Sequence, residues 1–234
     1  MESRLLGAVC ACAFISSIST SVSAALIAYE SRTGFETAIS GLASTTVDFD
    51  SASVGLAIPS GSTFDGITFT YSLTDLFGDP LTMVVDDYFD TTSSPNYLGL
   101  QSTVSSDLVN FVSGDSFTMD FAQPVNAVGL NIIANDVLLP GDLFSLSLAV
   151  TGIGGIITNP LAPSQTLADG GQVYFLGVTS DQAFSSVVFG SGGMELEFTH
   201  DDITYAAVPL PAAVWLLGSG LVFIGGIARR KVNS

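Results

Sequence analysis

Eight short segments rich in Val, Ile, Phe, Thr or Tyr fill the middle of the chain and limit what it can fold into. In one of them Phe117, Met119 and Phe121 alternate with polar neighbours, which gives a strand one apolar face. Gly, Ser, Asp, Asn or Pro separates the segments, and long amphipathic helical patterns are missing between them. We therefore predict an all-β fold, an antiparallel β-sandwich of jelly-roll type. The segments are 46–50, 66–72, 81–85, 116–121, 125–133, 143–150, 172–178 and 183–190.

One short helix is expected just before these segments. Thr33 and Glu36 have the spacing of a capping box, in which each side chain satisfies a free backbone amide at the start of a helix. Phe35 and Ile39 supply an apolar face, and Gly41 follows as a stop signal.

The charges are distributed unevenly along the chain. It carries 22 acidic residues against five Lys plus Arg, yet 47% of its residues are hydrophobic, which excludes plain disorder. Residues 25–207 hold every acid except Glu2 and a single base, Arg32, so this body carries about 20 negative charges. Such a body excludes nucleic acid as a partner, because phosphate backbones are bound by many Lys and Arg side chains. The remaining bases are Arg4, Arg229, Arg230 and Lys231.

The N-terminus has the layout of a secretory signal peptide. A charged start precedes an apolar run over 5–15, and small residues over 22–25 form a cleavage site. We expect residues 1–24 to be removed, with the cut between Ala24 and Ala25. A short buried strand or helix is the alternative.

Both cysteines, Cys10 and Cys12, lie inside this leader. The mature body would therefore contain no thiol, no disulfide and no cysteine-based metal site. A lipoprotein in which one of the two cysteines is acylated is a minor alternative.

The C-terminus reads as a membrane anchor. Residues 210–228 are uncharged and long enough to cross the hydrocarbon core as a helix, with Trp215 as an interfacial anchor. The basic residues Arg229, Arg230 and Lys231 then mark the cytoplasmic side, which places the body on the far side of the membrane.

The segment just before this span carries a resemblance to a known family. With the span and the basic cluster, it resembles the VPLPA variant of the PEP-CTERM sorting signal, over about the last tenth of the chain. The resemblance implies an exported surface protein of a Gram-negative bacterium, processed by an exosortase as its partner, in an exopolysaccharide or biofilm setting. An ordinary anchor with a chance VPLPA is the alternative. The motif consists of Val208, Pro209, Leu210, Pro211 and Ala212.

The resemblance also implies a location and a division of the chain. The body would pass through the inner membrane, stay on its periplasmic side while the C-terminal helix is lodged there, and end at the cell surface or in the extracellular matrix. We divide the chain into a signal peptide (1–24), one β-sandwich domain (25–207) and a sorting signal (208–234).

Four carboxylates are candidate calcium ligands. Asp48 and Asp50 lie in one early strand, and Asp201 and Asp202 lie where the apolar phase of the last strand slips, which predicts a bulge or turn over 200–202. Calcium takes six to eight oxygen ligands, and a body this acidic suits it. Residues 198–205 also resemble the closing strand of lectin-like jelly rolls, which implies a structural calcium. Solvated turn carboxylates are the alternative.

The leading functional expectation is a structural or adhesive matrix protein that is not an enzyme. A calcium-assisted carbohydrate-binding module is the alternative, with Tyr88 and Tyr97 as candidate stacking residues, although tyrosines in a sandwich are often structural. A secreted hydrolase comes third. The sole histidine, His200, is expected at the surface, and no pair among the carboxylates is singled out as a glycosidase site.

Overall fold

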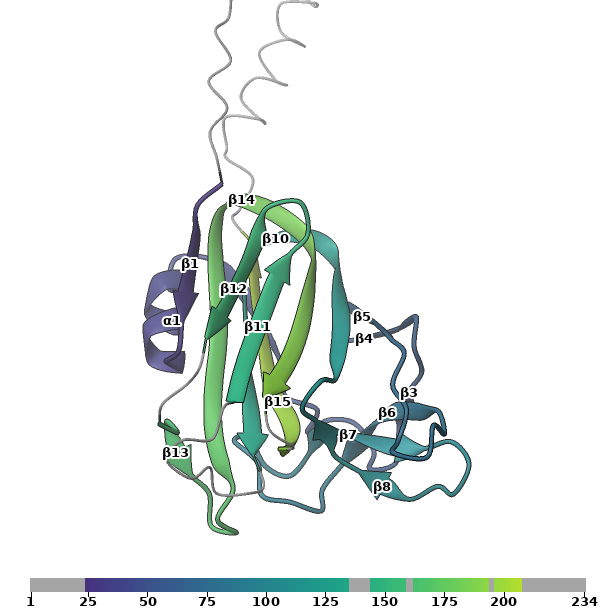
Figure 1. Cartoon of the computed structure of the whole chain (residues 1–234). Coiled ribbons are helices and arrows are strands. Elements are labelled where there is room, and N and C mark those ends of the chain that lie inside the picture. Colours follow the sequence, from purple (N-terminus) through teal and green to yellow (C-terminus); the bar gives the residue numbers. More distant parts are fainter. Residues whose placement is uncertain (1–23, 135–143, 159–161, 194–195, 208–234) are drawn as a thin grey trace, which may run out of the picture.

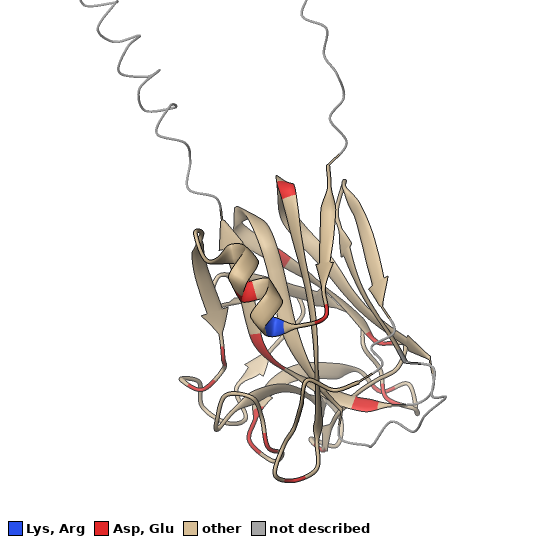
Figure 2. Cartoon of the chain, turned by 90° about the vertical axis from the view of Figure 1, so that its left-hand side faces the viewer, with Lys and Arg blue, Asp and Glu red and all other residues tan. Residues whose placement is uncertain are grey.

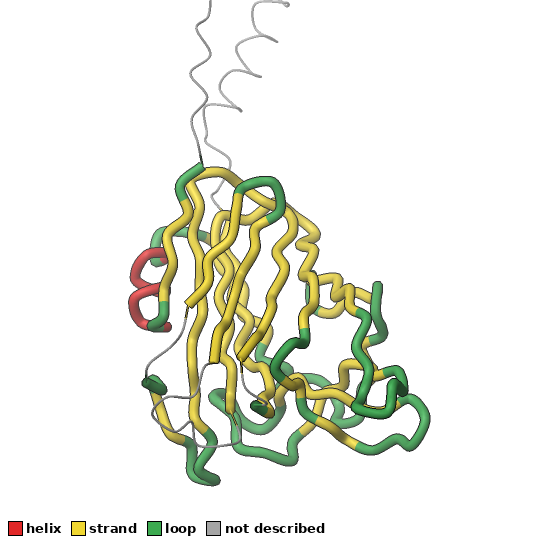
Figure 3. Tube along the Cα trace, viewed as in Figure 1, coloured by secondary structure: helices red, strands yellow, loops and turns green. Residues whose placement is uncertain are grey.

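The computed structural model describes residues 24–134, 144–158, 162–193 and 196–207, which form one helix and fifteen strands. Every strand pairing among them is antiparallel, so the predicted all-β, antiparallel architecture with one helix is confirmed. Strand and loop make up nearly all of this body (Figure 3). The elements are β1 (Leu26–Tyr29), α1 (Arg32–Ile39), β2 (Ala43–Val47), β3 (Ala57–Ile58), β4 (Ser62–Phe64), β5 (Ile67–Tyr71), β6 (Leu81–Asp86), β7 (Tyr97–Ser102), β8 (Leu108–Val109), β9 (Phe111–Val112), β10 (Ser116–Ala134), β11 (Phe144–Val150), β12 (Gly154–Thr158), β13 (Gln165–Thr166), β14 (Gln172–Gly193) and β15 (Glu197–Ala207).

Two long strands, β10 and β14, organise the sheet. The sequence predicted two separate segments in each of them, and the structure joins these segments into strands of 19 and 22 residues. The chain does not turn back between the predicted segments. Instead, the pairing of β10 with β14 shifts register between Asp120 and Val125 and again before Ala127, and such irregularities bend a strand without ending it.

The bend divides the sheet into two limbs that share one core. The first half of β10 pairs with β5 and with the second half of β14, which carries β11 and then β12. The second half of β10 pairs with β15 and with the first half of β14, which carries β1 and β13. Phe117 and Phe189 from the first limb and Leu130 and Phe198 from the second are buried in the same cluster. Figure 1 shows α1 on one side of this body and β3, β6, β7 and β8 projecting on the other.

The N-cap of the helix lies two residues before the predicted one. Ser31, in extended conformation, is the N-cap, and its Oγ accepts a hydrogen bond from the Gly34 amide at 3.4 Å. Thr33 therefore lies in the first turn, and the predicted Thr33–Glu36 capping box is wrong. Serine is as good a cap as threonine, so spacing alone could not choose between the two residues.

A pair of glycines seats the helix on the sheet. Gly129 and Gly177 are opposite each other in β10 and β14, and the buried ring of Phe35 lies against them. A Cβ atom at Gly177 would lie 2.8 Å from ring atoms of both Phe35 and Phe175, far inside ordinary van der Waals contact. The absence of side chains at these two positions lets α1 approach the sheet and carries Arg32 toward β15.

Both ends of the described body leave the sheet at the same end. Leu26 at the start of β1 pairs with Ser180, and Ala207 at the end of β15 pairs with Ala43. Ala127 of β10 pairs with Thr179 on one side and with Ala206 on the other. The start of β1 and the end of β15 therefore lie at the same height along the sheet. The two ends are at the top of Figure 1.

The predicted leader and anchor lie outside the described residues, as do Cys10, Cys12, the motif over 208–212 and the basic cluster over 229–231. Within the described ranges, no helix is both long and apolar enough to cross a membrane.

Candidate functional site

The irregularity in β15 falls where the sequence predicts it. Between Gly129 and Asn131 the pairing of β10 with β15 shifts register, and Asp202 has a φ of 51°. This backbone conformation is uncommon for a residue other than glycine, and it marks a bulge. The bulge does not expose its carboxylates, because Asp201 is fully buried and Asp202 is nearly so. The alternative of solvated turn carboxylates is therefore wrong for this pair.

Asp201 is held by the segment 91–93. Its Oδ2 accepts hydrogen bonds from the Thr92 hydroxyl at 2.8 Å and the Ser93 amide at 2.9 Å, and from the Thr91 hydroxyl. Its Oδ1 accepts the amide of Asp202 at 2.7 Å. Burial raises the pKa of Asp201 to about 6, and the neighbouring charge of Asp202 adds to this rise while the hydrogen bonds oppose it.

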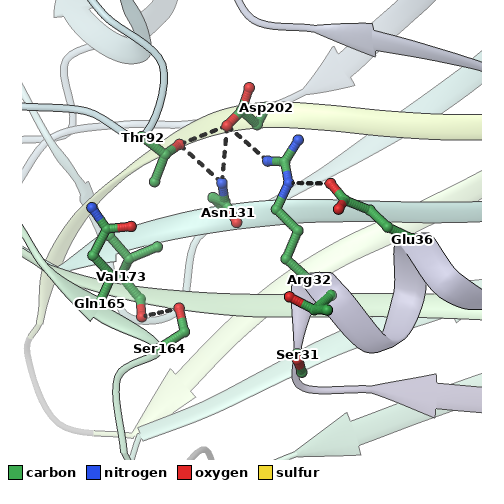
Figure 4. Close-up of a pocket in the computed structure, with 10 residues that line it drawn as sticks. Ser31, Arg32, Glu36, Thr92, Asn131, Ser164, Gln165, Val173 and Asp202 are labelled. Atoms are coloured by element: carbon green, nitrogen blue, oxygen red, sulfur yellow. Dashed lines mark hydrogen bonds and ion pairs between the residues drawn. The ribbon is translucent and has the colours of Figure 1, made fainter.

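Asp202 lies at the centre of a second network, drawn in Figure 4. Its Oδ2 is 2.7 Å from Arg32 Nη1, and it accepts hydrogen bonds from Asn131 Nδ2 at 3.1 Å and Thr92 Oγ1 at 2.8 Å. Thr92 Oγ1 thus lies 2.8 Å from both carboxylates, although a hydroxyl has one hydrogen to donate. The hydroxyl therefore donates to one of the two carboxylates at a time.

The other two candidate calcium ligands behave differently from each other. The backbone carbonyl of Asp48 lies 3.5 Å from Ser93 Oγ, which also contacts Asp201, so Asp48 does reach this region. The carboxylate of Asp50 instead accepts the Asn96 amide at 2.9 Å. Among the described residues, no three His, Cys, Asp or Glu side chains are grouped so that they could hold a metal ion. Calcium binding therefore stays a prediction.

Arg32 is the one Lys or Arg of the described residues, and Figure 2 shows it on α1 in an otherwise acidic body. Its Nε lies 2.8 Å from Glu36 Oε1 and its Nη1 pairs with Asp202. Within the described part of the chain, no hydrogen bond or ion pair involves its Nη2 atom. The spacing of Arg32 and Glu36, four residues apart on a helix, is a sequence signal for the first of these pairs.

A polar cavity of about 540 Å³ opens between α1, β10, β13 and β15. We call it the Arg32 cavity (Figure 4). Sequence reasoning identified only Asp202 of its lining as a site residue, because single Thr, Asn, Ser and Gln residues in strands and loops carry no distinctive pattern. The cavity is lined by Ser31, Arg32, Thr33, Glu36, Thr92, Asn131, Ser164, Gln165, Val173 and Asp202.

Three aromatic or histidine predictions can be compared with the structure. His200 is not at the surface: it is completely buried, and Phe117 and Phe189 are among the four rings that meet it edge-on. The expectation failed because the bulge begins after His200, which keeps this side chain facing the core. Tyr97 is also buried and donates a hydrogen bond to Asp86, so it cannot stack on a sugar. Tyr88 is 76% exposed, as a stacking residue must be.

The imidazole of His200 has no hydrogen-bond partner of ordinary geometry among the described residues. Desolvation lowers its pKa to about 3, and the backbone of Asn131 opposes this only weakly. The ring is therefore neutral at physiological pH and out of reach of solvent.

These features define an all-β protein with one docked helix and a polar cavity at the junction of helix and sheet. Comparison of the sequence with protein-family models and with curated proteins finds no match.

Proposed function

We propose that this chain is an exported bacterial surface or extracellular-matrix protein whose C-terminal signal is processed by an exosortase. The proposal rests on the resemblance of Val208–Lys231 to the VPLPA-type sorting signal and on the leader over 1–24. Its role there is structural or adhesive, in an exopolysaccharide or biofilm setting.

The observation that supports this proposal most directly is the position of the two ends of the body. A domain that follows a secretory leader and precedes a membrane anchor presents one end to the membrane. Leu26 and Ala207 both lie at the same end of the sheet, which suits that arrangement. The opposite end and the projecting β3, β6, β7 and β8 then face away from the membrane and toward matrix components.

We further propose that the body is a jelly-roll-like sandwich. Two limbs of one antiparallel sheet that share a single core support this description. A non-catalytic role is supported by His200, the only histidine in the sequence, because a neutral ring enclosed by phenylalanines cannot exchange protons with a substrate. The hydrolase alternative gains nothing from this residue.

Replacing Pro209 and Pro211 with Ala in the native host tests the sorting claim. The two prolines hold the chain extended outside the membrane, where a protease can reach the backbone. We expect the double variant to accumulate in the inner-membrane fraction at the mass of the unprocessed tail-bearing form. Pro124→Ala, at an exposed position of β10, is the matched control and should reach the surface normally. Normal processing of the double variant would remove the role of the motif.

The second candidate is a calcium-assisted carbohydrate-binding module. The observation that favours it is the Arg32 cavity, whose polar lining includes Asp202 of the predicted calcium site. A glycan array probed with calcium and with a chelator tests this candidate. Binding that depends on calcium supports it, and failure to bind any glycan contradicts it.

A further inference from the structure

We propose that the Arg32 cavity binds a small, neutral, polyhydroxylated ligand, a pyranose sugar, with Arg32, Thr33 and Gln165 as its contacts. This inference rests on the carbohydrate-binding candidate and gives it a location and a ligand class. The predicted calcium ligand Asp202 faces the cavity as the partner of Arg32, so the proposed ligand contacts are different residues.

The floor of the cavity is fixed before any ligand arrives. Asn131 is buried, and its Nδ2 donates to both Thr92 Oγ1 at 2.9 Å and Asp202 Oδ2 at 3.1 Å. Asp202 Oδ2 forms an ion pair with Arg32 Nη1 without hydrogen-bond geometry, while Glu36 accepts a hydrogen bond from Arg32 Nε on the other side. A guanidinium with two anchored nitrogens loses little freedom when it binds a ligand, so less of the binding free energy is spent on ordering it.

Three groups at the wall of the cavity remain available to a ligand. Within the described residues, no hydrogen bond or ion pair involves Arg32 Nη2, the Thr33 hydroxyl or the Gln165 side-chain amide. In Figure 4 the Gln165 amide lies across the cavity from the Arg32 guanidinium. Together they offer donors and acceptors from two sides, and a sugar hydroxyl both donates and accepts.

The charges select against an ionised ligand. Arg32 is shared between Glu36 and Asp202, which leaves the lining with one excess negative charge when both carboxylates are ionised. The surrounding body carries about 20 negative charges, so a uronate or a phosphate is repelled on approach. The same field attracts an ammonium group, but one placed against Nη2 meets the like charge of Arg32, so the ligand that contacts Nη2 is a neutral one.

The size and the lining set the expected strength of binding. A volume of about 540 Å³ lies within the range of small-molecule sites and accommodates one or two pyranose rings. None of the described residues that line the cavity is aromatic, so a sugar ring gains no stacking energy from them. A few hydrogen bonds without stacking give an expected Kd on the order of 1 mM.

The test is a titration of the full-length chain, kept in detergent, with single sugars followed by NMR. Glucose, galactose, mannose and N-acetylglucosamine are the neutral probes, and glucuronate and glucosamine are the charged ones. We expect saturable shifts of the Gln165 and Asn131 side-chain amides with at least one neutral probe. Both charged probes should bind more weakly. Failure of all four neutral sugars to saturate, or a preference for a charged one, would overturn the inference.

Matched variants locate the binding. Thr33→Val with Gln165→Ala removes two contacts without touching either ion pair, and it should weaken binding about fivefold or more. Thr45→Val with Gln123→Ala, at exposed positions outside the cavity, should leave binding unchanged. Equal affinity of the two double variants would overturn the inference. If both double variants bound sugar equally and a chelator abolished this binding, the calcium-assisted candidate would stand, but the Arg32 cavity would not be its site.

Discussion

Asp202 Oδ2 lies 2.7 Å from Nη1 of Arg32, and this contact joins the helix to the bulged strand. The Asp202 side chain is 10% exposed and the Arg32 side chain 30% exposed, so the pair is partly shielded from solvent. A carboxylate this deeply placed must be paired, because leaving it ionised without a partner costs several kcal/mol. Arg32, the single Lys or Arg of residues 25–207, thus compensates the charge of the buried Asp202.

Replacing Arg32 with Met should destabilise the protein by about 2 kcal/mol. The change leaves Asp202 buried without its counter-ion, and the partial exposure of Arg32 reduces the cost below that of a fully buried pair. The measurement is urea unfolding at neutral pH. Glu36→Gln removes the exposed partner of the same arginine and should cost less than about 0.5 kcal/mol. Equal effects of the two substitutions would show that the Asp202 pair is not the important one.

Gly177→Ala should loosen the helix and destabilise the fold by about 2 kcal/mol, because its Cβ would overlap the rings of Phe35 and Phe175. The control is Gly41→Ala, since a Cβ there would meet nothing within 4 Å. Calorimetric melting of both variants checks the prediction. A Gly177→Ala variant that melts at the wild-type temperature would contradict the close docking of α1.

His200→Leu should raise stability at pH 7 by about 1 kcal/mol, because it removes a buried imidazole without hydrogen-bond partners. The native pKa of about 3 lies below the ordinary value, so the unfolded chain takes up the proton first as pH falls. Stability from this residue is complete above about pH 6.5 and is lost on acidification, by about 2 kcal/mol at pH 5. The difference in unfolding free energy between wild type and variant should therefore grow from pH 7 to pH 5. A constant difference would mean that His200 is not buried as a neutral ring.

Calcium should raise the melting temperature if Asp201 and its neighbours bind it, because a ligand that binds only the folded state stabilises that state. Asp201→Asn should abolish the rise, and Asp107→Asn, at an exposed loop position, should preserve it. Differential scanning fluorimetry with calcium, magnesium and a chelator measures the effect. Identical melting in calcium and in chelator would rule out the predicted site.

The fold was largely predictable because alternation of apolar and polar residues directly reports a strand with one buried face. The pattern could not show that 116–121 and 125–133 belong to one strand, since the break between them is a bend stabilised by pairing with β14. It did locate the bulge, because the change of apolar phase before Ile203 is a local property of the sequence. The N-cap was missed because Ser31 and Thr33 are chemically equivalent caps.

The candidate site was less predictable. Asp201 and Asp202 were singled out as carboxylates at an irregular position, but their burial depends on the segment 91–93, which is more than a hundred residues away in the chain. Asn131 looked like one polar residue in an apolar strand. Its role appears only when β10, β15 and Thr92 are brought together.

The intact mass of the mature protein, isolated from the surface or medium of its native host, tests the central claim most directly. The account predicts a chain that begins at Ala25 and lacks the basic cluster at Arg229–Lys231, because the leader and the sorting tail are both removed. A mature protein that still begins at Met1, or that still ends at Ser234, would contradict it.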